Sequence, residues 1–115
     1  MPAASTPVLT LTVTLSGTVA AHRFVTPAGA QAGADANTLG VARTSGVSGD
    51  KVAVDVLGTS IVEAGAAISA GATIETNASG KAVTWATSGP KVAIALQAAS
   101  GDGDLIEVLL IPNAA

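Results

Sequence analysis

Short runs of alternating apolar residues, separated by turns that contain glycine, fill the sequence from Gly40 to Ile111. The clearest runs are Val52, Val54 and Val56; Val92, Ile94 and Leu96; and Ile106, Val108 and Leu110. The turns between such runs are Ser48-Gly49-Asp50, Asn77-Ala78-Ser79-Gly80, Ser88-Gly89-Pro90 and Ser100-Gly101-Asp102-Gly103-Asp104. Alternation with a period of two residues, broken by frequent turns, is typical of an all-β sandwich or barrel. We therefore expect an all-β fold, a small single-domain sandwich or barrel of short strands.

The same pattern predicts where the strands lie. The expected ranges are Val8–Leu15, His22–Thr26, Thr38–Arg43, Lys51–Leu57, Ser60–Glu63, Thr73–Thr76, Lys81–Ala86, Lys91–Ala98 and Leu105–Ile111. The last of these is apolar on both faces, which favours a central position in the sheet. Pro27–Asn37 is either a loop or a short helix, and its two glycines, each costing a helix about 1 kcal/mol, favour the loop.

The chain has 115 residues, which is the size of one domain. Met1–Pro7 consists of small residues and prolines, so we expect a flexible N-terminal arm over residues 1–7 and a single β domain over residues 8–115. Hydrophobic residues make up 49% of the sequence but aromatic residues only 2%, and much of the remainder is alanine. A core of small side chains buries little apolar surface, which favours a protein that gains stability from neighbouring molecules.

The hydrophobic N-terminal segment does not have the pattern of a membrane span. A spanning helix needs about 20 mainly apolar residues. Here Leu9, Leu11 and Val13 alternate with threonines, as in an amphipathic strand. A secretory leader begins with a positively charged region, and the first 21 residues carry no ionisable side chain. We expect no membrane association and no targeting signal.

Charge and cysteine content exclude several classes of protein. The net charge is -3, and the five basic residues are scattered singly, so we expect no direct binding to nucleic acid. The sequence contains no cysteine, which excludes disulfides, thiol catalysis and thiolate metal sites.

The residues able to carry chemistry form no recognisable site. His22 is the only histidine and has no second ligand or nucleophile near it in the sequence. Asp102 and Asp104 resemble the start of a calcium loop, but Glu107 comes too soon to be its distal ligand, so a tight turn is favoured. We therefore expect no enzyme, no catalytic or metal-binding residues and no cofactor.

Two further features have a structural and a functional interpretation. Trp85 alternates with Val83 and is predicted to belong to the core, although an interface anchor is the alternative. The segment Ser48–Val54 resembles Ser88–Ile94, which indicates either the same turn-into-strand solution used twice, the favoured interpretation, or an internal duplication.

The segment from Gly40 to Leu110 resembles the head decoration, or capsid cement, proteins of tailed bacteriophages. The matching phrases are Asp50-Lys51-Val52-Ala53-Val54 leading to Gly58, Ala64-Gly65-Ala66-Ala67-Ile68-Ser69-Ala70-Gly71, Asn77-Ala78-Ser79-Gly80-Lys81-Ala82-Val83, and the run from Val92 to Leu110. The N-terminal third of the chain matches less well. The resemblance implies a structural virion protein that binds the outer surface of an expanded capsid. Its implied partner is the major capsid protein, whose subunit contacts it stabilises, and it is made in the host cytoplasm. It also implies self-association as a dimer or trimer.

If the regular part of the chain is a scaffold, its less regular N-terminal part is expected to contact the capsid. The uncharged alternating strand and its loose leader favour strand addition to a neighbouring sheet edge. The predicted capsid-contact residues are Pro2, Pro7, Thr10, Thr12, Thr14, Gln31 and Asp35.

A carrier domain of the biotinyl or lipoyl type, or another small interaction module, is the alternative. Residues 62–74, with glycine-spaced turns, are faintly similar to such a β-sandwich. A carrier presents a lysine at a hairpin tip between two hydrophobic residues, and Lys81, between Gly80 and Ala82, fits that requirement poorly.

Overall fold

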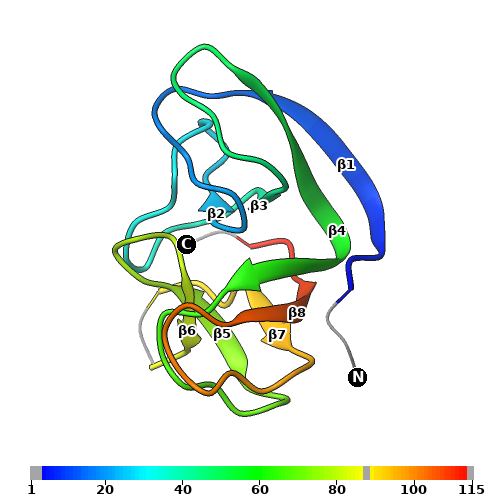
Figure 1. The fold of residues 1–115 in the computed structure, drawn as a ribbon, viewed down its shortest axis with the longest axis vertical. Helices are drawn as coiled ribbons and strands as arrows, with labels where there is room; N and C mark the ends of the chain where they lie inside the picture. The colour runs from blue at the N-terminus through cyan, green and yellow to red at the C-terminus, as the bar shows by residue number, and fades with distance from the viewer. Residues whose placement is uncertain (1–3, 87–88, 114–115) are drawn as a thin grey trace.

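A computed structural model describes residues 4–86 and 89–113 of the chain. The described residues contain strands and turns but no helix, which confirms the all-β prediction (Figure 1). The strands are β1 (Pro7–Thr14), β2 (Phe24–Val25), β3 (Gly40–Ala42), β4 (Lys51–Glu63), β5 (Thr73–Thr76), β6 (Ala82–Thr84), β7 (Ala93–Ala95) and β8 (Leu105–Leu110). They form one antiparallel sheet in the order β2-β3-β4-β8-β7-β5-β6, and β1 pairs with β4 outside this path.

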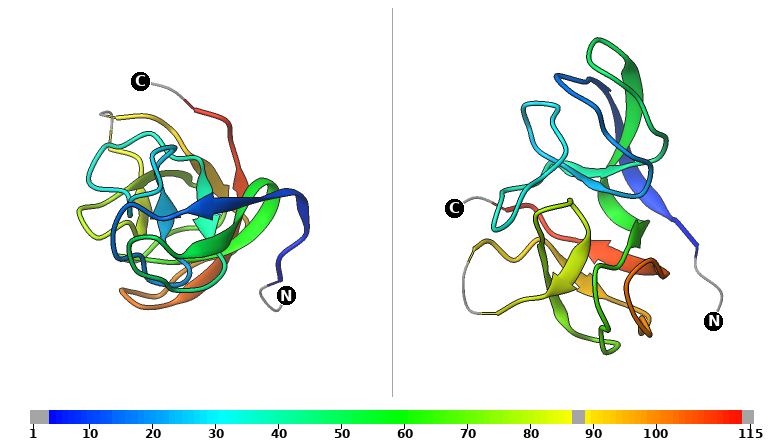
Figure 2. Two further views of the ribbon diagram at one scale, coloured as in Figure 1. Left: turned by 90° about the horizontal axis from the view of Figure 1, so that it is seen from above. Right: turned by 60° about the vertical axis from the view of Figure 1, so that its left-hand side comes forward.

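The long strand β4 connects the upper and lower parts of the molecule (Figure 2). The prediction of two separate strands over 51–57 and 60–63 is therefore wrong. Gly58 allows the continuous strand, because it bends the chain with a φ of 93° and any side chain there would collide with Thr6. β1 pairs with the first part of β4, and β8 pairs with Thr59–Glu63.

The chain forms two structurally equivalent halves, which we call the N-terminal half (residues 7–57) and the C-terminal half (residues 58–110). Matching backbone hydrogen bonds define the equivalence. The N–H of Leu15 donates to Asp50 O at 2.8 Å, and the N–H of Ala64 donates to Asp104 O at 2.7 Å. Further hydrogen-bonded pairs in the N-terminal half are Val19–Gly46, Leu39–Val25, Ala42–Arg23 and Arg43–Ala53. Their counterparts in the C-terminal half, in the same order, are Ile68–Ala99, Val92–Ile74, Ala95–Ala72 and Leu96–Glu107.

The two hydrophobic cores are built from equivalent positions. The core of the N-terminal half contains Leu15, Val19, Val25, Ala42, Val52 and Val54. By the hydrogen-bond and register correspondence, their counterparts are Ala64, Ile68, Ile74, Ala95, Ile106 and Val108, all of which lie in the second core. Phe24 also belongs to that second core, so the two halves pack against each other.

This correspondence differs from the echo seen in the sequence. The structure matches Ser48–Val54 with Asp102–Val108, not with Ser88–Ile94, because β4 and β8 occupy the same place in their halves. In both segments a glycine with positive φ is followed by an aspartate that leads into the strand: Gly49 (φ 91°) and Gly103 (φ 95°).

Most other strand predictions are confirmed with shorter limits. Thr73–Thr76 is β5 as predicted, β8 lies centrally between β4 and β7, and Pro27–Asn37 contains turns rather than a helix. The prediction that Trp85 belongs to the core is wrong. Its half-buried ring lies after β6, donates Nε1–H to Gly89 O at 3.1 Å, and is covered by the ammonium of Lys91 at 4.5 Å from the ring centroid.

Candidate docking surface

The outer edge of β1 is open at two of the predicted threonines, Thr10 and Thr12. The N–H of Arg43 donates to Ala53 O, so the backbone groups of Ala53 point toward β3 and those of its neighbours Val52 and Val54 point toward β1. In the β1–β4 register these residues pair with Val13 and Leu11. The N–H and C=O groups of Thr10, Thr12 and Thr14 consequently point away from β4, and no strand among the described residues pairs with that edge. At Thr14 a loop covers the edge, because the N–H of Ser16 donates to Gly29 O and a side chain at Gly29 would collide with Thr14 O.

β1 is exposed on both of its faces, although the alternating sequence predicted one buried face. Val8 is 79% exposed, and Leu9 and Leu11 are 41% and 39% exposed. Only Val13 packs partly against the core of the N-terminal half. Proteins usually protect an open edge with charges, proline or a bulge. Here Pro7 and the register shifts beside Leu9 protect the start of β1, and no charged residue protects the remainder.

Pro7 and the preceding residue are held against β4. Pro7 is the first residue of β1 and pairs with Gly58, so the strand begins before the predicted arm ends. Thr6 and Thr59 exchange two backbone hydrogen bonds of 3.2 Å each. The predicted contact residue Pro2 lies outside the described residues.

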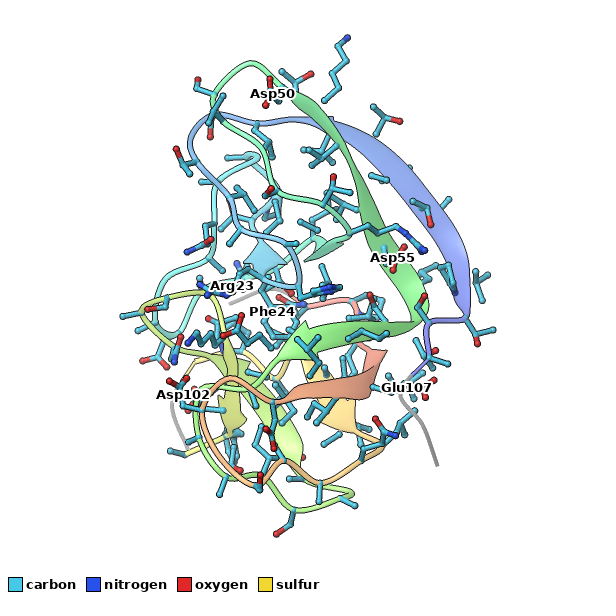
Figure 3. The ribbon with its side chains drawn as sticks, in the orientation of Figure 1. Arg23, Phe24, Asp50, Asp55, Asp102 and Glu107 are labelled. Atoms are coloured by element: carbon cyan, nitrogen blue, oxygen red, sulfur yellow. The ribbon has the colours of Figure 1, made fainter. Side chains whose placement is uncertain are left out.

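A buried carboxylate on β4 binds the side chain of a β1 threonine. Asp55, on β4, is 1% exposed, and its Oδ1 accepts hydrogen bonds from Thr10 Oγ1 at 3.0 Å and from Arg43 at 3.1 Å (Figure 3). Its Oδ2 accepts from Ser60 Oγ at 2.7 Å. A small cavity of about 130 Å³ lies beside this group and is lined by Ser5, His22, Arg43, Asp55, Ser60 and Ile61. The carboxylate of Asp55 is thus shared among the donors Thr10, Arg43 and Ser60 in one polar network.

The predicted contact residue Gln31 is engaged within the chain. Its Oε1 accepts from Ala20 N–H at 3.0 Å, and its Nε2 donates to Ser79 O at 3.0 Å. Gln31 therefore joins the two halves of the molecule through Ala20 and Ser79.

An ion-pair network lies close to Gln31. Glu63 contacts Arg23 Nε at 3.2 Å and Lys81 Nζ at 3.1 Å, and Lys81 also contacts Asp102 at 2.8 Å. Burial acts to raise the pKa of Glu63, but hydrogen bonds from Lys81 and Arg23 outweigh that effect and lower it. The network joins the N-terminal half to turns of the C-terminal half.

Asp35 lies at a third location, against β5. It adopts a positive φ of 55° and is exposed. Burial, together with a hydrogen bond that the protonated Glu75 donates to Asp35, raises the pKa of Glu75, and the N–H of Ala86 donates to Glu75 Oε2 at 3.0 Å. The predicted contact residues thus do not form one patch: only Thr10, Thr12, Thr14 and Pro7 share an element.

The pattern of β8 predicted its central position but did not indicate that two of its leucines are exposed. Leu105 and Leu109 are 49% and 40% exposed. Among residues 4–86 and 89–113, no cluster of three or more His, Cys, Asp or Glu side chains is able to hold a metal ion. No helix in the described part of the chain is long and apolar enough to cross a membrane.

Comparisons with known proteins identify the family of the chain. The family model for phage cement proteins matches residues 3–110. Among solved structures, the N base of the head fiber gp8.5 of bacteriophage phi29 has the same fold, with a TM-score of 0.72 and 21% sequence identity over 93% of this chain and 97% of that chain. A search of curated protein sequences finds no match. Because the family match spans nearly the whole sequence, the chain belongs to the phage cement proteins, a family of structural proteins of the phage capsid.

Proposed function

We propose that this protein binds the outer surface of an expanded phage head and stabilises contacts between major capsid subunits. The observation that carries the proposal is the open, uncharged edge of β1, where Thr10 and Thr12 present unpaired backbone groups beside exposed apolar side chains. A strand of the capsid protein that pairs with this edge would satisfy those groups.

A modest contact per copy suffices for such a role. One strand pairing and a few apolar contacts bind weakly, but each shell offers many equivalent positions. Linking two or three copies in a small oligomer raises the effective affinity further, because the second contact forms within one complex. We therefore propose a dimer or trimer that acts without a cofactor or a catalytic step and is made in the host cytoplasm before it joins the virion.

Cosedimentation tests this function. The purified protein is mixed with expanded heads of its own phage that lack it, and occupancy is measured after sedimentation. We expect saturable binding, and a truncation that lacks residues 1–7 should lose occupancy because it removes the contacts of Thr6 and Pro7 with β4. Failure of the intact protein to bind such heads contradicts the proposal, and undiminished binding of the truncated chain contradicts the role of the N-terminal segment.

The carrier alternative gains no support from the position of Lys81. Its ammonium contacts Glu63 at 3.1 Å and Asp102 at 2.8 Å, and its side chain is 16% exposed. A lysine held in this way is not presented to a modifying enzyme.

A further inference from the structure

The two halves of the molecule contain the same strand edge, and the chain covers it in only one of them. The hydrogen bonds that match Leu15 with Ala64, together with the strand registers, make Thr10 of β1 equivalent to Thr59 of β4. Thr59 lies on the edge of β4 that faces away from β8. Thr10 lies on the outer edge of β1, at the rim of the molecule (Figure 1). The C-terminal half is therefore a template for how the edge at Thr10 is filled.

In the C-terminal half, the segment before β1 covers this edge. Thr6 and Thr59 exchange two backbone hydrogen bonds of 3.2 Å each, and the N–H of Thr6 also donates to Thr59 Oγ1 at 2.9 Å. The covering segment runs antiparallel to β4, because Pro7, the next residue, pairs with Gly58. A short extended segment that makes one such exchange is sufficient to satisfy the edge at this position.

In the N-terminal half, the equivalent backbone groups have no partner. The N–H and C=O of Thr10 point away from β4, and no backbone hydrogen bond reaches them from residues 4–86 or 89–113. Further along the edge the halves are alike, because His22 O accepts from the N–H of Glu63 and a loop lies against Thr14, which is equivalent to Glu63. The halves therefore differ at the position that Thr6 fills.

The side chains beside this edge differ in polarity between the halves. Ser60, next to Thr59, lines a polar cavity together with Ser5 of the covering segment. Its equivalent next to Thr10 is Leu11, which is 39% exposed. The Cβ atoms of side chains that face each other across antiparallel strands are about 4.5–5.5 Å apart, so a residue opposite Leu11 packs directly on it. A polar residue suits Ser60, and an apolar residue suits Leu11.

We infer that the capsid strand that covers β1 runs antiparallel to it, exchanges two backbone hydrogen bonds with Thr10, and places an apolar side chain opposite Leu11. The direction and register follow from the way Thr6 pairs with Thr59. The apolar residue follows from the exposed leucine, whose surface leaves water only against an apolar neighbour. This inference rests on the proposed function and adds the direction of the partner strand and the chemistry of one of its residues.

Cross-linking on expanded heads tests the direction. The chain contains no cysteine, so one introduced cysteine carries a photoactivatable cross-linker at a defined position. Val8→Cys and Thr12→Cys place the label on either side of Thr10, and mass spectrometry identifies the capsid residues that they reach. The numbering of two antiparallel strands runs in opposite directions, so the Val8 label should reach a later capsid residue than the Thr12 label. Leu105→Cys is the matched control, because Leu105 is exposed on β8, which β4 separates from β1.

Binding measurements test the residue opposite Leu11. Leu11→Ser installs the side chain found at the equivalent position, and we expect binding about tenfold weaker because an apolar contact with the partner is lost. Leu11→Met keeps an apolar side chain of similar volume and should bind as the wild type does. The melting temperatures of the free variants separate a loss of stability from a loss of binding.

The outcomes separate the inference from the proposed function. Cross-links with opposite numbering, and none to the same capsid segment from Leu105→Cys, support the inference. Cross-links with parallel numbering overturn it, as does head-bound protein whose β1 labels reach no capsid residue, and both results leave binding to the head standing. Equal binding by Leu11→Ser and the wild type overturns the apolar residue opposite Leu11. Failure of the wild type to bind contradicts the proposed function, and the inference falls with it.

Discussion

The Oγ1 of Thr10 donates a hydrogen bond of 3.0 Å to Oδ1 of Asp55, so a residue of the exposed strand β1 is anchored by a carboxylate that is 1% exposed. Arg43 and Ser60 donate further hydrogen bonds to that carboxylate. The hydroxyl of Thr10 is therefore hydrogen-bonded within the molecule, while its backbone N–H and C=O stay on the open edge.

Replacing Asp55 by alanine should strongly destabilise the fold. The change leaves Arg43 and Ser60 without their acceptor and removes the hydrogen bond that ties Thr10 of β1 to β4. We expect it to lower the free energy of unfolding by about 3–5 kcal/mol. Urea unfolding measures this cost. Asp50→Ala, in an exposed turn where the carboxylate accepts one hydrogen bond from Val47, is the control and should cost about 1 kcal/mol. Equal effects of the two substitutions would show that the Asp55 network does not hold β1.

Thr12→Pro should separate binding from stability. The N–H of Thr12 faces the open edge, and proline is tolerated on an edge strand at such a position, so the melting temperature should change little. Binding to heads should fall about tenfold, since a pairing hydrogen bond is lost and the proline ring obstructs the edge. Thr12→Val keeps the N–H and should bind normally. Normal binding by the proline variant would exclude strand pairing at Thr12.

Glu63 should contribute to unfolding in acid. Its pKa in the folded protein lies below the ordinary value of 4.5, so the stability it supplies is present above that pH and is lost as the pH falls through the folded pKa. Chemical unfolding of wild type and Glu63→Gln at a series of pH values measures the effect. The variant should be less stable near neutral pH, and the difference should shrink on acidification. A difference that is independent of pH would contradict the assignment.

Glu75 should have the opposite effect. Burial and the nearby Asp35 carboxyl raise its pKa, so the folded state retains the proton longer than the unfolded chain and stability falls as the pH rises through the folded pKa. Glu75→Gln removes this loss and can still accept from Ala86 N–H. Its melting temperature should exceed that of wild type at pH 7 and approach it in acid. A variant less stable than wild type at pH 7 would refute the prediction.

The sequence predicted the fold class and the approximate positions of most strands, because alternation and glycine turns are local signals. It predicted β5 with its observed limits and the central place of β8. It missed the continuity of β4, since Gly58 was interpreted as a break although here it bends a strand around Thr6. It also missed the structural repeat, because equivalence lies in the hydrogen-bond pattern more than in residue identity.

The candidate surfaces were predictable only in part. Alternation in β1 indicated an apolar face but not whether the chain itself covers that face, and Leu9 and Leu11 remain exposed. The same limit applies to Leu105 and Leu109, whose exposure depends on which elements pack over β8. Trp85 was assigned to the core because it alternates with Val83, whereas here Lys91 covers its ring.

Amide hydrogen exchange on the free and the head-bound protein is the most direct test that β1 pairs with the shell. In the free protein, the amides of Leu11 and Val13 face β4 and should be protected, while those of Thr10 and Thr12 should exchange rapidly. Binding to expanded heads should protect Thr10 and Thr12 and leave Leu11 and Val13 unchanged. Rapid exchange of Thr10 and Thr12 in protein that is fully bound to heads would contradict the account.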